Sequence, residues 1–403
     1  MNVKCISDNL LCAGCGACNA ICTRGAISMK RTATMGLLYA CVDDIKCIDC
    51  GLCLKVCPSV NILERKSEVA KEDIVGDIKS CYVGRSLNPD IFKNAQSGGL
   101  VTQILSYLFD ENLIDAVISC RMIFGRGVPN VSYNILTSKE ELHLNQKSCY
   151  TQVDVVSALK ETNSYRSVAR VGLPCQIQGV AKLSELKKCK NITYKIGLVC
   201  DKTYSNTYMN AIMNNSYQKE DVLIKYRQKD FTFRDVYYSY QKAPTVICGK
   251  EGVLSIIPNR KRMFLKEFFT VPKCRLCADK LNVYADIVLG DPWGMKDKYD
   301  QNQGDSLILV RTEKGISILN ELVKDSLVSV VRADVEEVVR GQFIKERVND
   351  IHLLDWNEKK RIWMRHEGMS KSQIVQLVNK KYKKGLFKSF MGDLLIRIKK
   401  IFK

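Results

Sequence analysis

The spacing of apolar residues along the chain separates helix-like from strand-like segments. Residues 98–114 carry apolar side chains at intervals of three and four positions, which predicts a long amphipathic helix. Four short apolar runs rich in β-branched residues predict strands, at residues 114–120, 167–173, 192–200 and 285–290. Because these helix and strand signals alternate, the pattern predicts a mixed α/β core.

The same pattern divides the chain into domains and favours the α+β fold class. Residues 1–66 form two short, similar halves, each with a strand-like run, and predict a small domain of their own. Residues 67–80 are charged and poor in large apolar side chains, which is typical of a linker. The core then has an N-terminal part, 81–160, and a C-terminal part, 161–335, and residues 336–403 predict a basic helical tail.

Composition indicates a folded protein with reduced cysteines. The 403 residues are 46% apolar, enough for a sizeable core and two or three domains. We recognise no signal-like or membrane-spanning run, so the 19 cysteines favour metal ligation in the cytoplasm over disulfides. The three histidines, His143, His352 and His366, lie in no motif, which argues against histidine-based acid–base or metal chemistry.

The net charge of +19 is concentrated in the tail. Residues 340–403 contain 17 Lys and Arg against 6 Asp and Glu, and residues 385–403 combine apolar and basic positions at helical spacing. Two interpretations fit this segment: a helix lying peripherally on an anionic inner membrane face, or a terminal helix docked on its own domain. Nucleic-acid binding is not expected, because the basic residues lack a recognition module and base-stacking aromatics.

Two runs of cysteines near the N-terminus share one spacing, C-x2-C-x2-C-x3-C. They are Cys12, Cys15, Cys18 and Cys22, and then Cys47, Cys50, Cys53 and Cys57. This spacing is typical of a domain with two 4Fe-4S clusters, in which the fourth cysteine of each run ligates the cluster of the other run. One predicted cluster is therefore held by Cys12, Cys15, Cys18 and Cys57, and the other by Cys47, Cys50, Cys53 and Cys22. Zinc or disulfides are the alternatives, although zinc sites often include histidine.

Four further cysteines predict a third 4Fe-4S cluster, in the core. Cys274 and Cys277 have the spacing of a chelating pair, whose thiolates can point from one turn toward one metal. Cys175 and Cys200 each end an apolar strand-like run, a position from which side chains commonly face a cofactor crevice. The alternative is that the pair binds zinc or is a redox dithiol, while Cys175 and Cys200 are buried core thiols.

Ser97, Gly98 and Gly99 stand at the start of the predicted helix in the core. Free N–H groups at the positive end of a helix dipole, next to a hydroxyl, can bind a phosphate or another anion. The alternative is an ordinary helix cap without a ligand. The sequence pattern alone leaves both open.

Several segments, taken in their order along the chain, resemble the coenzyme F420 hydrogenase/dehydrogenase beta-subunit family. In this chain a ferredoxin-type domain precedes them. The resemblance covers nearly all of residues 1–330 and is carried by residues 81–105, 147–150, 171–179, 197–200 and 272–294. The family resemblance implies an FAD in the core, with Ser97, Gly98 and Gly99 near its phosphates. It further implies that Lys147, Ser148, Gln176 and Asp291 line the flavin site and that the core cysteines hold a cluster close to it.

Three functional hypotheses follow. The leading one is an iron-sulfur flavoprotein oxidoreductase that passes electrons between a ferredoxin-type partner and FAD to convert an organic substrate, with surface-polysaccharide biosynthesis as one setting. The second is an F420-oxidising or F420-reducing subunit of a larger redox complex. The third is an electron-transfer or scaffold subunit without catalysis. Sequence alone names neither the substrate nor the direction of electron flow.

Overall fold

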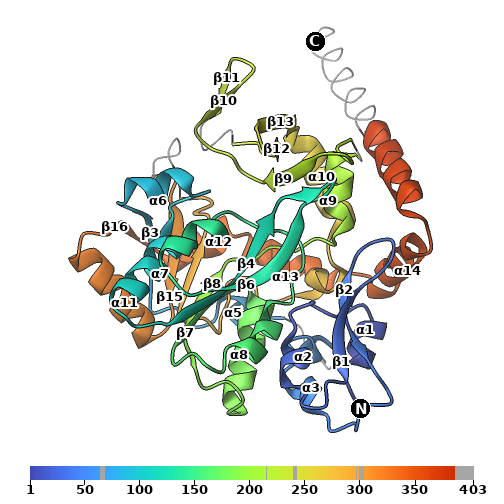
Figure 1. Ribbon diagram of the computed structural model, residues 1–403, viewed down its shortest axis with the longest axis horizontal. Coiled ribbons are helices and arrows are strands. Elements are labelled where there is room, and N and C mark those ends of the chain that lie inside the picture. Colours follow the sequence, from blue (N-terminus) through green and yellow to red (C-terminus); the bar gives the residue numbers. More distant parts are fainter. Residues whose placement is uncertain (64–68, 215, 239–242, 296, 299–303, 386–403) are drawn as a thin grey trace.

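The computed structural model describes residues 1–63, 69–214, 216–238, 243–295, 297–298 and 304–385 (Figure 1). At its centre lies an eight-stranded sheet whose strands run in the order β16 (Val328–Ala333), β3 (Ser80–Ser86), β15 (Ser306–Val310), β14 (Ile287–Gly290), β8 (Ile192–Leu198), β7 (Val168–Gly172), β4 (Ala116–Ile123) and β6 (Asn130–Leu136). Neighbouring strands from β14 to β4 are parallel, and the strands outside them pair antiparallel. The four strands predicted from apolar runs are confirmed.

Helices cover both faces of this sheet. One face packs against α7 (Leu100–Asp110) and α11 (Glu313–Lys324), and the other against α5 (Lys71–Val75), α8 (Pro174–Glu185), α12 (Val335–Gly341) and α13 (Ile344–His352). Side chains alternate between the faces as a strand requires: Ile287 and Leu289 belong to the first core, and Val288 to the second. Helix α7 confirms the predicted amphipathic helix, and the mixed α/β core is confirmed with it.

A second region, which the apolar pattern did not predict, lies beside the large sheet. Its four-stranded sheet has the order β13 (Gly252–Ile257), β12 (Thr245–Gly249), β9 (Asp221–Lys225) and β5 (Gly125–Arg126). The short elements around it and at the loops are α6 (Pro89–Asn94), α9 (Thr207–Met213), α10 (Asn259–Phe269), β10 (Phe231–Phe233), β11 (Val236–Tyr238), and the 3-10 helices η1 (Glu140–Asn145), η2 (Val155–Glu161) and η3 (Pro272–Leu276).

The N-terminal domain packs directly on the core (Figure 1, blue). It contains α1 (Lys4–Asp8), α2 (Ala17–Ile21), β1 (Ile27–Arg31), β2 (Leu38–Val42), α3 (Leu52–Lys55) and α4 (Val60–Leu63). Helix α2 lies against α8 because Gly179 has no side chain: a Cβ there would lie 2.9 Å from the Cβ of Ala17 and 3.9 Å from the sulfur of Cys15. The two parts therefore share one apolar core.

The predicted linker, residues 67–80, contains helix α5. Ile74 and Val75 of this helix are buried in the core, and its first turn is closed by Asp73, which accepts a hydrogen bond from the N–H of Ala70. The segment is charged on its exposed side only. A short amphipathic helix thus has the composition of a linker while it packs as part of the core.

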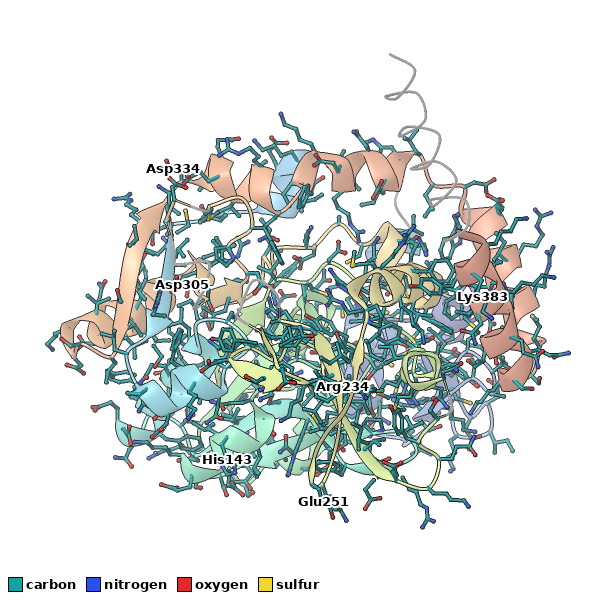
Figure 2. The ribbon with its side chains drawn as sticks, turned by 90° about the horizontal axis from the view of Figure 1, so that it is seen from above. His143, Arg234, Glu251, Asp305, Asp334 and Lys383 are labelled. Atoms are coloured by element: carbon teal, nitrogen blue, oxygen red, sulfur yellow. The ribbon has the colours of Figure 1, made fainter. Side chains whose placement is uncertain are left out.

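The tail is helical through most of its described part, 336–385, in α12, α13, α14 (Trp356–Glu367) and residues 371–385. Glu367 accepts hydrogen bonds from the backbone N–H groups of Thr34 (2.8 Å) and Met35 (3.0 Å), which fastens α14 to the N-terminal domain. Lys383 marks the end of the described tail, and the exposed His143 lies on the periphery of the molecule (Figure 2). The predicted membrane-binding segment falls almost wholly in 386–403, outside the described residues. None of the helices that the structure describes is long and apolar enough to cross a bilayer.

Candidate iron-sulfur and cofactor sites

The structure gathers Cys57 with three cysteines of the first run. Burial raises the pKa of Cys15 and of Cys18 well above its ordinary value, and nearby sulfurs raise it further: Cys175 and Cys57 act on Cys15, and Cys12, Cys15 and Cys57 on Cys18. Gly14 donates its backbone N–H to the sulfur of Cys12 at 3.4 Å from a left-handed conformation (φ 70°) that glycine adopts readily. This donor set, four buried sulfurs with backbone N–H groups turned toward them, fits the predicted ligands of one 4Fe-4S cluster.

The second predicted ligand set lies nearer the surface. Cys47 and Cys50 sit in the loop between β2 and α3, and Cys50 is exposed. Cys53 lies on α3, which packs against α2, and Cys22 follows the last residue of α2. Asn2 donates an amide N–H to the sulfur of Cys47 at 3.5 Å. Cys53 also acts on Cys18, so the two N-terminal sets are neighbours.

The four core cysteines come from separate parts of the chain and meet at one edge of the large sheet. Cys175 and Cys200 follow the carboxyl ends of the parallel strands β7 and β8, while Cys274 lies on η3 and Cys277 just after it. Burial raises the pKa of Cys175 to about 12, and Cys277 and Cys274 contribute to the rise. The pKa of Cys200 is also raised well above its ordinary value, by burial and then by Cys274, Cys175 and Cys277.

Three thiols of this core group, those of Cys175, Cys274 and Cys277, interact with a buried lysine. Lys273 is 3% exposed and donates to the sulfur of Cys277 at 3.1 Å. Burial lowers the pKa of Lys273, but Cys277, Cys175 and Cys274 together raise it above its ordinary value. Four neighbouring sulfurs, three of which interact with a buried ammonium, fit a site for an anionic iron-sulfur cluster.

Two further residues, Arg347 and Thr203, contact the segment that carries Cys274 and Cys277, and neither belongs to a cysteine motif. Arg347, on α13 of the tail, is 5% exposed and donates to the carbonyl oxygens of Cys274 and Cys277, to the latter at 3.0 Å. Thr203 has its hydroxyl 3.3 Å from the sulfur of Cys274. Within the described residues, no three His, Cys, Asp or Glu side chains are arranged as ligands of a single metal ion.

Three adjacent residues, Arg227, Gln228 and Lys229, contact several of the residues that were predicted to line the flavin site. Arg227 pairs with Asp291 through two contacts of 2.9 Å. Gln228 accepts from Lys147 at 3.4 Å, and Lys229 donates to the carbonyl oxygen of Ser97 at 3.1 Å. The segment 227–229 thus brings the start of α7, the Lys147–Ser148 turn and the end of β14 together.

The region around this segment is strongly positive. We call Arg85, Lys147, Lys225, Arg227 and Lys229 the cationic cluster. Asp305 pairs with Arg85 at 2.6 Å (Figure 2). Burial lowers the pKa of Lys147 to about 8, with a contribution from Lys225, and lowers the pKa of Lys229 to about 8, with contributions from Arg85 and Arg227.

Next to the cationic cluster lies a polar group without a partner. The amide oxygen of Gln96 accepts the N–H of Ser148 at 3.0 Å, while its amide nitrogen is buried with no hydrogen-bond partner among the described residues. A bound acceptor such as a phosphate or a flavin carbonyl would satisfy this nitrogen, and an anionic ligand would also be attracted by the positive charges of the cluster. The cationic cluster therefore fits an anionic cofactor.

The structure gives different contacts to the other residues predicted near the flavin, which are Gln176, Gly98 and Gly99. Gln176 lies on α8, where it donates to the carbonyl oxygen of Val153 at 3.2 Å and accepts from the N–H of Leu173 at 3.0 Å, so the structure does not bring it to the cationic cluster. Gly98 donates to the hydroxyl of Ser306 at 3.0 Å and packs against β3 and β15. Gly99 caps α7 in the left-handed region (φ 77°).

Comparison with family models identifies the class of protein and then the family. A 4Fe-4S dicluster domain matches residues 11–81, so the chain carries an iron-sulfur domain of that type. The models for the N-terminal and C-terminal parts of the coenzyme F420 hydrogenase/dehydrogenase beta subunit match residues 81–160 and 165–336. The chain belongs to this family, and the resemblance inferred from its motifs is confirmed.

Several relatives are F420-linked proteins of methanogens. The chain is 25% identical to one subunit of the F(420)H(2) dehydrogenase from Methanosarcina mazei, over 79% of this chain and 83% of that one. It is 25% identical to the beta subunit of the coenzyme F420 hydrogenase from Methanococcus voltae, over 73% and 98%. It is 27% identical to the coenzyme F420-dependent sulfite reductase of Methanocaldococcus jannaschii, over 78% of this chain but only 46% of the reductase. The chain thus spans about half of that enzyme.

A solved structure shares the fold. A chain of the F420-reducing [NiFe] hydrogenase complex from Methanosarcina barkeri superposes with a TM-score of 0.53 at 21% identity, over 71% of this chain and 93% of that one. The comparison supports the mixed α/β arrangement described above.

We expect about twelve iron atoms per chain, four for each of three clusters, in protein purified without oxygen. Replacing Cys274 by Ala removes one ligand of the core group and should lower the iron content to about eight. Cys189→Ala is the matched control, because Cys189 is a buried thiol outside all three groups. Iron and acid-labile sulfide analysis checks this, and equal iron in the Cys274→Ala variant and the unmodified protein would contradict the core site.

Anion binding at the cationic cluster should weaken as the pH rises. Lys147 and Lys229 lose their charge around pH 8, whereas a bound phosphate favours the charged form. We expect the affinity for FAD, and separately for F420, to fall about tenfold for each lysine that the ligand contacts between about pH 7 and pH 9. Lys229→Met should weaken binding at pH 7 and flatten this dependence, while the exposed control Lys324→Met should leave both unchanged. Titration calorimetry measures this, and an affinity independent of pH would refute it.

Proposed function

We propose that this protein is the iron-sulfur subunit of a larger redox complex and transfers electrons between coenzyme F420 and one-electron carriers. The proposal rests on how the sites follow one another in space. Two N-terminal cysteine sets lie beside the core cysteine set, and the cationic cluster lies at the same edge of the large sheet as the core set. Cys200 and Asp291 follow the neighbouring parallel strands β8 and β14 at that edge, and this arrangement supports the proposal. The names of the relatives support the F420 assignment.

The chemistry requires a change from electron pairs to single electrons. A deazaflavin such as F420 exchanges a hydride, whereas a 4Fe-4S cluster takes one electron at a time. A flavin can accept a hydride and release its electrons one by one, so we propose that an FAD lies between F420 and the core cluster. The residues that would hold it are Ser97, Lys147, Ser148 and Lys229.

The residues of the chain have defined roles in this proposal. Lys147 and Lys229 bind the anionic part of the cofactor. Asp291 orients Arg227, because the two are joined by a bidentate ion pair whose geometry fixes the guanidinium plane. Gln96, through its buried amide nitrogen, supplies a donor in the same region. Hydride transfer itself needs no ionisable acid–base pair, so the proposal requires no histidine at this site.

The N-terminal domain provides the exit or entry for single electrons. Cys50 is exposed, and two large apolar side chains of the same loop, Ile45 (98% exposed) and Ile48 (63%), stand beside it. The charges of this loop are paired, Lys46 with Asp43 at 3.4 Å, and Lys4 with Asp44 at 2.8 Å. An apolar, locally neutral surface around an exposed cluster ligand suits a small redox partner such as a ferredoxin.

The second sequence hypothesis is therefore preferred to the leading one. A surface-polysaccharide substrate has no support in the relatives described above, whose names concern F420, and membrane binding by the tail rests on residues outside the described part. A purely structural role leaves the amide nitrogen of Gln96 buried without a hydrogen-bond partner among the described residues, whereas a bound ligand would supply one.

The proposal is tested by mixing F420 with protein that was purified without oxygen and reduced by dithionite, after removal of excess reductant. We expect the absorbance of F420 to bleach while the cluster absorbance returns, and FAD to be released on denaturation at about one per chain. The Lys229→Met variant should bleach F420 more slowly with its iron content intact. Intact clusters with no bleaching of F420 would refute the proposal, and bleaching without released flavin would refute the FAD step alone.

Partner docking at the loop beside Cys50 has its own test. Ile48→Asp places a charge on the apolar surface and should lower the second-order rate constant of cluster reduction by reduced ferredoxin about tenfold, equivalent to about 1.4 kcal/mol. Reduction by dithionite, which needs no protein surface, should be unchanged. The control is Leu353→Asp, at an apolar residue of the tail that is 85% exposed. Stopped-flow absorbance measures both rates, and equal ferredoxin rates in all three proteins would place docking elsewhere.

A further inference from the structure

The first N-terminal cysteine set and the core set adjoin each other. Cys15 interacts with Cys175, which belongs to the core set, and Gly179 allows the helix that follows Cys15 to lie directly on α8. Cys175 itself lies in the first turn of α8. Of the two N-terminal sets, the one with Cys12 and Cys15 is thus next to the core, and the one with the exposed Cys50 is farther from it.

Lys273 occupies the boundary between the two adjoining sets. Its ammonium donates to Cys277 of the core set at 3.1 Å, and its charge acts on Cys175 and Cys274 as well. The same charge acts on Cys12 of the N-terminal set. Within the described residues, no carboxylate forms a salt bridge with Lys273, and the side chain is 3% exposed. Its buried charge therefore acts on sulfurs of both sets, and it also acts on the buried carboxylate of Asp279.

A ligated 4Fe-4S cluster is an anion, because its four thiolates outweigh the charge of the cube, and an added electron makes it more negative. A fixed cation in a poorly screened interior favours the more negative, reduced form. A hydrogen bond to a ligating sulfur acts in the same direction, and both are known determinants of cluster potential.

We propose that Lys273 is the shared counter-cation of the core cluster and the adjoining N-terminal cluster, and that it sets the reduction potential of the core cluster. It holds that potential high enough for electrons to pass between the two clusters across their common boundary. This inference rests on the proposed core cluster. Lys273 is a positioning and tuning residue, since it contacts ligating sulfurs and not the substrate.

The test is a redox titration followed by paramagnetic resonance, on full-length protein purified without oxygen. Lys273→Met should lower the equilibrium constant for reducing the core cluster at least tenfold, a shift of about 59 mV to more negative potential for one electron. Lys273→Gln, which keeps a donor but not the charge, should recover part of the shift. Lys273→Arg should recover most of it. The Cys274→Ala variant identifies which signal belongs to the core cluster.

Lys182→Met is the matched control. Lys182 donates to the carbonyl oxygen of Cys57 at 3.0 Å, so it is a second lysine beside the N-terminal set, but it makes no contact with the core sulfurs that the structure describes. Its replacement should leave the core potential unchanged. A Lys182→Met shift as large as that of Lys273→Met would show a general effect of net charge and would overturn the proposal.

The remaining outcomes also decide the question. Lys273→Met protein with about twelve irons and an unchanged core potential overturns the role of Lys273 while the core cluster stands. About eight irons in the unmodified protein, with no third resonance signal, removes the core cluster itself. If Lys273→Met loses the core cluster and Lys273→Arg keeps it, a positive charge is required there, as proposed. Equal loss in both variants shows that the shape of lysine matters and its charge does not, which overturns the proposal.

Discussion

Sulfur atoms that must carry negative charge lie where water does not reach them, and the rest of the molecule is arranged around that constraint. Burial, and after it the neighbouring sulfurs, raise the pKa values of Cys15, Cys18 and Cys200 well above the ordinary value of a thiol, so these side chains remain neutral unless a positive centre joins them. Iron supplies such a centre, and the chain supplies only part of the compensation through Lys273 and through backbone N–H groups such as that of Gly14. The same constraint would explain why the twelve predicted ligands come in three groups of four, while other cysteines such as Cys81, Cys189 and Cys248 are buried as packing residues.

The parallel part of the large sheet determines which sites are neighbours. Strands β7, β8 and β14 end at one edge, and the residues that follow them are Cys175, Cys200 and Asp291. Because these strands are parallel and adjacent, two predicted ligands of the core cluster and Asp291 of the predicted cofactor site follow strand ends at the same edge of the sheet. The N-terminal domain approaches the core closely at α8, where Gly179 permits it, and this brings the predicted ligand Cys15 near the predicted core ligands. In the proposed function this close packing would favour electron transfer, because the rate of electron transfer falls steeply with distance.

Local patterns in the sequence predicted the helices, strands and cysteine groups that residue type and spacing mark, and missed residues that only the fold brings to the sites. The cysteine spacing and the strands β4, β7, β8 and β14 are of the first kind. The cations of 227–229 are of the second kind: nothing around Arg227 or Lys229 distinguishes them from surface residues until β9 brings them to the start of α7. Arg347 lies about seventy residues from the cysteines whose carbonyls it binds. Lys273 does adjoin Cys274 in sequence, but a lysine beside a ligand usually points to solvent, and only its burial reveals its position.

The basic character of the chain also has an explanation in this arrangement. The net charge of +19 counts the cysteines as neutral, whereas each ligated cluster would be an anion and would subtract from it. Three buried cations lie near the core cysteines, where they would balance the charge of a cluster. Lys273 interacts with the core sulfurs, Arg347 donates to carbonyl oxygens of the same loop, and Lys280, which is 7% exposed, lies near Cys200. Arg347 belongs to the tail, and Glu367 of the same tail binds the turn at Thr34 in the N-terminal domain. The tail thus joins the loop of the core cysteines to the domain of the other two sets, so a displacement of either would be opposed by the same helices.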